Sequence, residues 1–194
     1  MDDLTRITPT PQQLKALSHP VRLRILGLLR TEGPATATGL AARLGLNTGA
    51  TSYHLRQLAT HGFVEDDAER GNGRDRWWRA AHQSTYTDPA DLADASPEER
   101  ETYDAYAQSV AVVHTDLLQR AVEERALMPQ EWLEATTLSD WGIRLTAARA
   151  RELVDAIGEL VEGWSEDPVD DESADFVVVL HSFPYPGRLG GDPS

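Results

Sequence analysis

The 194-residue sequence contains no cysteine. Disulfide bonds, thiolate metal sites and thiol redox switches are therefore excluded, and the fold must rest on a packed apolar core. The sequence also lacks a run of about eighteen apolar residues, and residues 1–10 are acidic and polar rather than basic and then apolar. We therefore expect a cytoplasmic protein with neither a membrane span nor a secretion signal.

Motifs of catalysis are missing as well. There is no serine nucleophile elbow and no phosphate-binding loop, and Gly187, Gly190 and Gly191 lie in a tail without the strand and helix that a nucleotide site requires. The acidic run over residues 167–175 lacks the glycine and the spacing of a calcium loop, which favours a solvated loop. We predict that the protein is not an enzyme and binds no cofactor and no metal.

Basic residues are outnumbered, with 18 Lys and Arg against 32 Asp and Glu, and the formal net charge is -14 at pH 7. The charge is unevenly distributed. Residues 1–82 hold 11 basic and 8 acidic side chains, a net of +3, and the remainder of the chain carries a net of -17. Because affinity for nucleic acids depends largely on the neutralisation of phosphates, only the first part is suited to contact DNA.

Two short helices separated by a glycine turn are predicted within this first part. Thr38 is placed to cap the first helix, which ends at Gly45, a residue that enters left-handed conformations at little cost. Asn47 or Thr48 caps the second helix, whose apolar spacing continues to His61. This arrangement is typical of a helix-turn-helix.

A hairpin is predicted directly after these helices. Residues 63–65 and 74–80 have the composition of strands, and the Gly/Asn-rich residues 69–73 form the turn between them. Trp77 and Trp78 are consecutive strand residues, so they point to opposite faces and one of them belongs to the core. The hairpin has the position of a wing beside the helix-turn-helix.

A long helix is predicted over residues 96–127. Ser96, Pro97 and Glu99 form a capping box with proline in the first helical position. An apolar stripe follows in steps of three and four, and we expect it to form a dimer interface because the winged module has a core of its own; packing within the same subunit is the alternative. The predicted interface residues are Tyr103, Tyr106, Val110, Val113, Leu117 and Ala121.

The fold class expected from these patterns is α+β and mainly α. It comprises a winged helix-turn-helix domain over residues 10–82, the dimerisation helix 96–127, and a small strand-helix-strand module of unknown role over residues 130–184. Residues 185–194 are rich in proline and glycine and are predicted to form a disordered tail.

The sequence resembles the ArsR-type winged-helix regulators. The resemblance is carried by residues 17–26 (LSHPVRLRIL), by residues 52–58 (SYHLRQL) and by Gly73-Arg74 ahead of the two tryptophans, and it covers about residues 10–82. It implies a homodimer that places two recognition helices in successive major grooves of double-stranded DNA, about 34 Å apart, at an inverted repeat. The function implied is sequence-specific transcription regulation, most simply repression.

The resemblance also implies which residues contact DNA. On the recognition helix, Arg56 is suited to guanine, and Ser52 and Thr48 are suited to phosphate near the helix N-terminus. The wing turn would enter the minor groove or clamp phosphate. The full predicted set is Thr48, Gly49, Ser52, Tyr53, Arg56, Arg70, Asn72 and Arg74.

The sequence departs from the metal sensors of that family. Residues 35–44 lack the cysteine pair of the thiolate sensors, and on the long helix only His114 and Asp116 resemble the other metal site. Residues two apart do not share a helix face, so that match fails. An unknown small-molecule effector stays open as a partner. The alternative function is a winged-helix protein-assembly module with a small-molecule-binding C-terminal domain.

Overall fold

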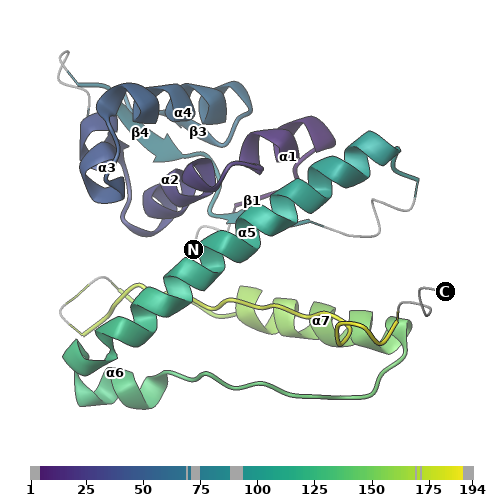
Figure 1. Cartoon of the computed structure of the whole chain (residues 1–194). Coiled ribbons are helices and arrows are strands. Elements are labelled where there is room, and N and C mark those ends of the chain that lie inside the picture. Colours follow the sequence, from purple (N-terminus) through teal and green to yellow (C-terminus); the bar gives the residue numbers. More distant parts are fainter. Residues whose placement is uncertain are drawn as a thin grey trace. The chain divides into compact units, whose positions relative to one another are not determined.

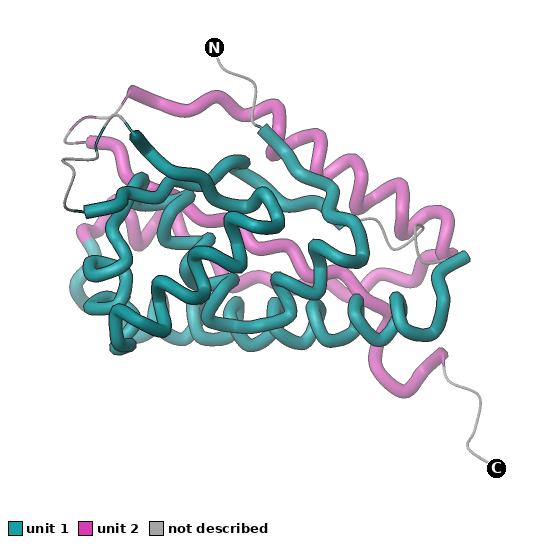
Figure 2. The backbone as a smooth tube through the Cα atoms, turned by 90° about the horizontal axis from the view of Figure 1, so that it is seen from above, with its two compact units in different colours: residues 1–128 teal, residues 129–194 magenta. Residues whose placement is uncertain are grey.

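The computed structural model describes residues 5–68, 70, 75–87, 94–168, 170 and 172–189. The chain divides into two compact units, Met1–Met128 and Pro129–Ser194 (Figure 2). The winged module and the long helix belong to the first unit, which also contains a short strand ahead of residue 10. The predicted tail begins at residue 185, and its residues 190–194 lie outside the described part of the chain.

The first unit contains six helices and five short strands among its described residues (Figure 1). In chain order these are β1 (Arg6–Ile7), α1 (Pro11–Leu17), α2 (Pro20–Thr31), β2 (Ala35–Thr36), α3 (Ala37–Leu44), α4 (Thr48–Thr60), β3 (Val64–Asp66), β4 (Trp77–Ala80), β5 (Ser84–Thr85), α5 (Pro97–Glu124) and the 3-10 helix η2 (Arg125–Leu127). The predicted helices, hairpin strands and long helix are all present.

Two small sheets tie the wing to the rest of the unit. β4 is the central strand of an antiparallel sheet of order β2-β4-β3, in which Ala35 pairs with Trp78 and Val64 with Ala80. The parallel pair β1-β5, with Arg6 opposite Ser84, joins the two ends of the winged module. The hairpin β3-β4 is the predicted wing.

The caps of the helix-turn-helix explain where its helices begin. The prediction that Thr38 caps α3 is wrong, because Thr36 has the extended backbone of an N-cap and its hydroxyl accepts from the Gly39 amide at 3.1 Å. Of the two candidates for α4, Asn47 is the cap, and its Oδ1 accepts from the Ala50 amide at 2.8 Å. Gly45 ends α3 in the left-handed region with φ 65°, as predicted.

One core holds the helices and the wing together. Its buried residues come from α1 to α4, from the segment that leads into the wing and from the wing itself: Ala16, Leu17, Ile25, Leu26, Leu29, Leu40, Leu55, Leu58, Phe63, Val64 and Trp78. Trp78 is 4% exposed and its neighbour Trp77 is half-buried, so the predicted division of the two rings between opposite faces is confirmed.

The long helix α5 packs on α1 and α2 of its own chain (Figure 1). Tyr106 lies against the core, and the buried hydroxyl of Ser109 donates to the Ser18 carbonyl at 2.7 Å. The Ser18 hydroxyl in turn donates to the Leu14 carbonyl at 3.0 Å and lies 3.4 Å from the Thr102 carbonyl. The break between α1 and α2 is therefore bonded to the middle of α5.

The second unit differs from its prediction. It contains α6 (Gln130–Ala135) and α7 (Ala147–Glu162), but none of its described residues forms a strand. The prediction of two strands in the module over residues 130–184 is therefore wrong. The apolar residues 176–180 are each at least 40% exposed and have no ladder partner, and a strand pattern cannot form a sheet without one. The stacking of Trp132 on Phe176, with ring centroids 6.3 Å apart, links α6 to this extended segment.

We predict that Ser109→Ala lowers the free energy of unfolding by about 1 to 3 kcal/mol, because the Ser18 carbonyl then loses a donor in a buried place. Chemical denaturation measures the effect. Thr115→Ala, on an exposed part of the same helix, serves as the control and should change stability far less. Equal stability of Ser109→Ala and the parent would show that this hydrogen bond does not hold α5 in place.

Candidate nucleic-acid interface

The helix α4 has a buried side and an outward side. Thr51, Leu55 and Leu58 are almost fully buried in the core, and the Thr51 hydroxyl is satisfied by the Asn47 carbonyl at 3.1 Å. Because a helix repeats every 3.6 residues, this inner row leaves the opposite side free. The core fixes the orientation of α4, and the residues on its outward side are not part of the core.

The structure brings four of the five predicted α4 residues to this outward side, and the fifth, Thr48, is the first residue of the helix, in line with the buried row. Thr48, Gly49, Tyr53 and Arg56 are exposed and Ser52 is half-buried, and the Tyr53 side chain is 53% exposed. Thr48 and Gly49 occupy the first turn, where backbone amides without helical partners favour anions. The arrangement offers a hydroxyl, a phenol and a guanidinium along one helix face, and a further hydroxyl and free amides at the helix N-terminus.

The wing is described only in part. Arg70 is exposed, and its Nε lies 3.7 Å from Asp67 Oδ2. Asn72 and Arg74 lie outside the described residues, so their predicted roles stay predictions. Directly before β4, Arg76 pairs with Asp66 of β3 at 2.8 Å, and its guanidinium carbon lies 4.1 Å from the centre of the Trp78 ring.

Three aromatic rings, of which the sequence-based site included only Tyr53, form a cluster between α4 and the start of α2. The rings of His19 and His54 have centroids 4.7 Å apart, and Tyr53 meets His54 edge-on at 5.5 Å. His19 caps α2, since its Nδ1 accepts from the Val21 amide at 3.2 Å. Both histidines belong to the motifs that carry the family resemblance, but only the fold shows that they touch.

Burial and a neighbouring guanidinium act on both rings of this pair. Desolvation, with the charge of Arg22 as the second cause, lowers the pKa of His19. For His54, desolvation again lowers the pKa most, followed by the charges of His19 and Arg22. A proton added to this cluster therefore meets both an apolar surrounding and an existing positive charge.

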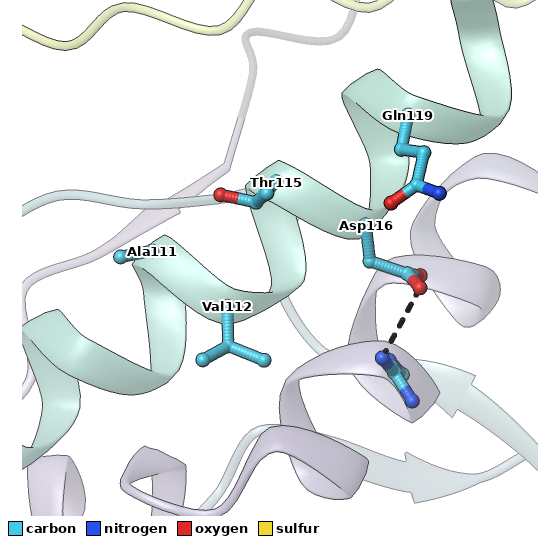
Figure 3. Close-up of a pocket in the computed structure, with 6 residues that line it drawn as sticks. Ala111, Val112, Thr115, Asp116 and Gln119 are labelled. Carbon is cyan, nitrogen blue, oxygen red and sulfur yellow. Dashed lines mark ion pairs between the residues drawn. The ribbon is translucent and has the colours of Figure 1, made fainter.

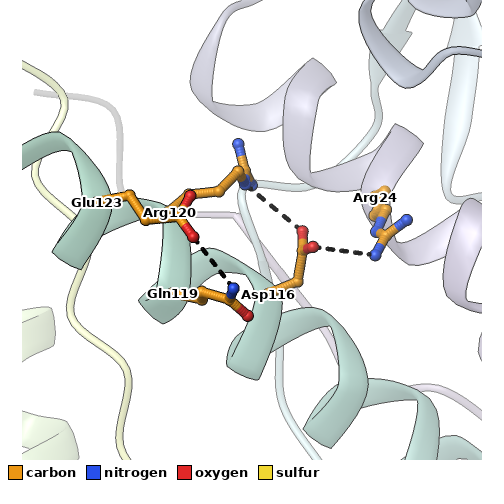
Figure 4. Close-up of polar contacts among 5 residues, drawn as sticks. All are labelled: Arg24, Asp116, Gln119, Arg120 and Glu123. Atoms are coloured by element: carbon orange, nitrogen blue, oxygen red, sulfur yellow. Dashed lines mark hydrogen bonds and ion pairs between the residues drawn. The ribbon is translucent and has the colours of Figure 1, made fainter.

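The face of α5 beside α2 carries a hollow and an ion-pair network. Arg24 and residues Ala111, Val112, Thr115, Asp116 and Gln119 line an open hollow of about 440 Å³ (Figure 3). Asp116 lies between two arginines, with Arg24 Nη2 at 3.4 Å and Arg120 Nε at 3.5 Å (Figure 4). Asp116 therefore links α5 to α2.

Part of the predicted dimer stripe packs against other elements of its own chain. Tyr106 packs against the core, Tyr103, Val110, Val113 and Leu117 are half-buried, and Ala121 is exposed. Three further apolar residues of α5 are about half exposed, namely Val112, Leu118 and Val122.

Within the described residues, no helix is long and apolar enough to cross a membrane. Across the same part of the chain, no three His, Asp or Glu residues gather closely enough to hold a metal ion.

Comparisons with known proteins agree on the first unit. A family model described as a helix-turn-helix domain matches residues 17–67. The HTH-type transcriptional regulator YgaV of Escherichia coli (strain K12) is 38% identical over 77 residues, which make up 36% of this chain and 77% of the relative.

Two solved structures were also matched. One, described as a possible transcriptional regulator for arsenical resistance, is 32% identical, with 51% of this chain and 93% of that chain covered at a TM-score of 0.32. The other, a mutant of Lactococcus lactis ZitR in its apo form, is 15% identical, with 73% and 81% covered at a TM-score of 0.31.

The helix-turn-helix α3-α4 with the β3-β4 hairpin beside it defines a winged helix-turn-helix protein. The chain belongs to the family of HTH-type transcriptional regulators that includes YgaV, and the resemblance to the ArsR-type regulators is confirmed. Membership implies DNA binding.

We predict that acid destabilises the protein through the histidine pair. A histidine whose pKa is lowered in the folded state takes up its proton first in the unfolded state, so its contribution to stability is complete above 6.5 and is lost as the pH falls below that value. The free energy of unfolding should therefore decrease below pH 6.5, and His54→Gln should make this decrease smaller. Denaturation curves above and below 6.5 measure it.

His61→Gln is the matched control, because His61 is the C-cap of α4, two turns away from His54, and its carbonyl rather than its ring accepts from Gln13. An acid loss of stability that is the same in His54→Gln as in the parent would contradict the assignment.

Proposed function

We propose that this regulator binds double-stranded DNA as a homodimer, reads an inverted repeat through α4 and the wing, and represses transcription by occupying promoter DNA. The observation that carries the proposal is the outward face of α4, which gathers Gly49, Ser52, Tyr53 and Arg56 on a helix held by its opposite face, with Thr48 exposed at the helix N-terminus.

The charge of Arg56 supports this reading most strongly. Its side chain is exposed, and among the described residues it has neither an ion pair nor a hydrogen bond. Other arginines of the first unit do have carboxylate partners, including Arg24, Arg43 and Arg79. In a chain with a net charge of -14, a cation without a partner on a helix-turn-helix is suited to an external anion or base.

The remaining contacts divide into two kinds. Ser52 and Thr48 sit in the first half of α4, where hydroxyls and free amides fit phosphate oxygens. Arg56 lies further along the helix and can give two parallel hydrogen bonds to guanine in the major groove. The wing residues Arg70, Asn72 and Arg74 would flank this contact.

We assign the homodimer interface to α5. Its apolar stripe runs beyond the residues that contact α1 and α2, and Ala121 at its end is exposed in the single chain. A helix of 28 residues is longer than the winged module needs for its own packing. Two copies joined there would present two α4 helices to one DNA duplex.

We predict that Arg56→Ala weakens binding to the operator by about 1 to 3 kcal/mol and reduces the preference over unrelated DNA. Fluorescence anisotropy with DNA from upstream of the protein's own gene measures both affinities over a range of salt concentrations. Arg151→Ala, in the second unit, is the control with the same charge change. Unchanged discrimination in Arg56→Ala would remove the residue from the readout.

The parent protein provides the test of the function itself. A specific complex that weakens with salt supports DNA readout. An absence of sequence preference at low salt would instead favour the winged-helix assembly role with a ligand-binding C-terminal unit.

We predict that Ala121→Glu shifts the protein from dimer to monomer, because the new carboxylate would be placed in an apolar contact without a partner. Ala121 is exposed in the single chain, so the fold of the protomer should survive. Sedimentation velocity measures the mass, and Thr115→Glu on another exposed part of α5 is the control. A dimer that persists in Ala121→Glu would place the interface elsewhere.

A further inference from the structure

Arg22 is a half-buried cation without a counter-charge. Its Nε is buried and lacks a hydrogen-bond partner, and among the described residues the guanidinium has no ion pair. Burial lowers the pKa of Arg22, with the charge of Tyr53 acting in the opposite direction. The guanidinium is partly withdrawn from water and no carboxylate offsets its charge, so an external anion would stabilise it.

Two histidine rings lie close to Arg22, since His19 precedes it by three residues at the start of α2 and His54 of α4 packs on His19. The Nδ1 of His19 accepts a hydrogen bond from the Val21 amide and therefore carries no hydrogen. The neutral ring then carries its hydrogen on Nε2. The Nδ1 of His54 is buried and unpaired, which leaves Nε2 as the nitrogen through which this ring can meet a ligand. Because burial and the charge of Arg22 lower the pKa of both rings, they are neutral donors near pH 7.

The cluster continues the outward face of α4. The Tyr53 ring contacts His54 edge-on, and Tyr53 is among the residues assigned to DNA contact. An anion bound at Arg22 would therefore lie beside the recognition helix, on the side where the N-terminus of α2 approaches it.

We propose that Arg22, His19 and His54 form a binding site for one backbone phosphate of DNA, which extends the interface from α4 to the N-terminus of α2. The proposal rests on the proposed DNA-binding function and adds a contact that carries no sequence information. The phosphate supplies the counter-charge that Arg22 lacks, and the histidine Nε2 atoms donate to its oxygens. The role of the site is to fix the position of α4 on the duplex.

Salt dependence tests the phosphate contact directly. Arg22→Gln should weaken binding to specific and unrelated duplexes by a similar factor of about ten, and should reduce the slope of log affinity against log salt by about 0.9 for each protomer. Arg22→Lys retains the charge and should keep the slope. Arg151→Gln, with the same loss of charge in the second unit, should leave both affinity and slope unchanged.

Two results from these variants would overturn the proposal. The first is a full slope in Arg22→Gln, even with lower affinity, since this would mean that Arg22 only supports the fold. The second is a loss in Arg151→Gln of the same size. A phosphate contact can be found on unrelated DNA, so failure to find an operator would count against the proposed function and not against this site.

A measurement on the unaltered protein keeps the test independent of the folding of the variants. The ring nitrogen signals of His19 and His54 in an NMR spectrum, identified with His19→Gln and His54→Gln, should shift when unrelated duplex DNA is added, and those of His181 in the second unit should not. Unmoved signals would overturn the proposal. Equal shifts with inorganic phosphate alone, at the same phosphate concentration, would overturn the assignment to DNA.

Discussion

The burial of Leu55 and Leu58 is the interaction on which the candidate site depends. These two side chains, with Thr51, fix the rotation of α4 about its own axis, because a turn of the helix would bring polar residues into the core. The outward residues therefore need no contacts of their own to be held in place. A helix fixed in this way can present unpaired polar groups, whose cost is offset by apolar packing on the opposite side.

The arginines of the first unit fall into two groups, those with a carboxylate partner and those without one. Arginines on the wing strands and on α3 are matched with carboxylates, as in Arg79 with Glu65 and Arg43 with Glu32. Arg56 and Arg22 have no such partner among the described residues. Exposed ion pairs contribute little to stability, so their main effect here is to cancel charges that would otherwise bind polyanions without preference. The two cations without such a partner lie on the outward side of α4 and at the start of α2.

The sequence was sufficient for features that depend on local chemistry. Capping residues, the left-handed Gly45, the alternation at Trp77 and Trp78 and the periodicity of α4 each act within a few residues. The error at α3 is of the same local kind, since Thr36 and Thr38 are both suitable caps and the choice between them depends on β2, which ends at Thr36. The strands expected in the second unit failed for another reason: residues 176–180 have strand composition, but pairing requires a partner that composition cannot supply. The meeting of His19 and His54 was likewise beyond sequence reasoning, because it joins residues 35 positions apart through packing of α2 against α4.

The helix α2 connects the two ends of the first unit. Its N-terminus carries Arg22 beside α4, and two residues further along the helix Arg24 pairs with Asp116 of α5. In the sequence, Asp116 and His114 were the only residues of the long helix that resembled a metal site. In the structure, the Asp116 carboxylate forms ion pairs with Arg24 and Arg120. Arg22 and Arg24 lie on the same turn of α2. Loss of the Arg24–Asp116 ion pair would therefore act on the helix that positions the proposed phosphate-binding cluster. Packed helices transmit small displacements in this way because interiors are dense and resist deformation.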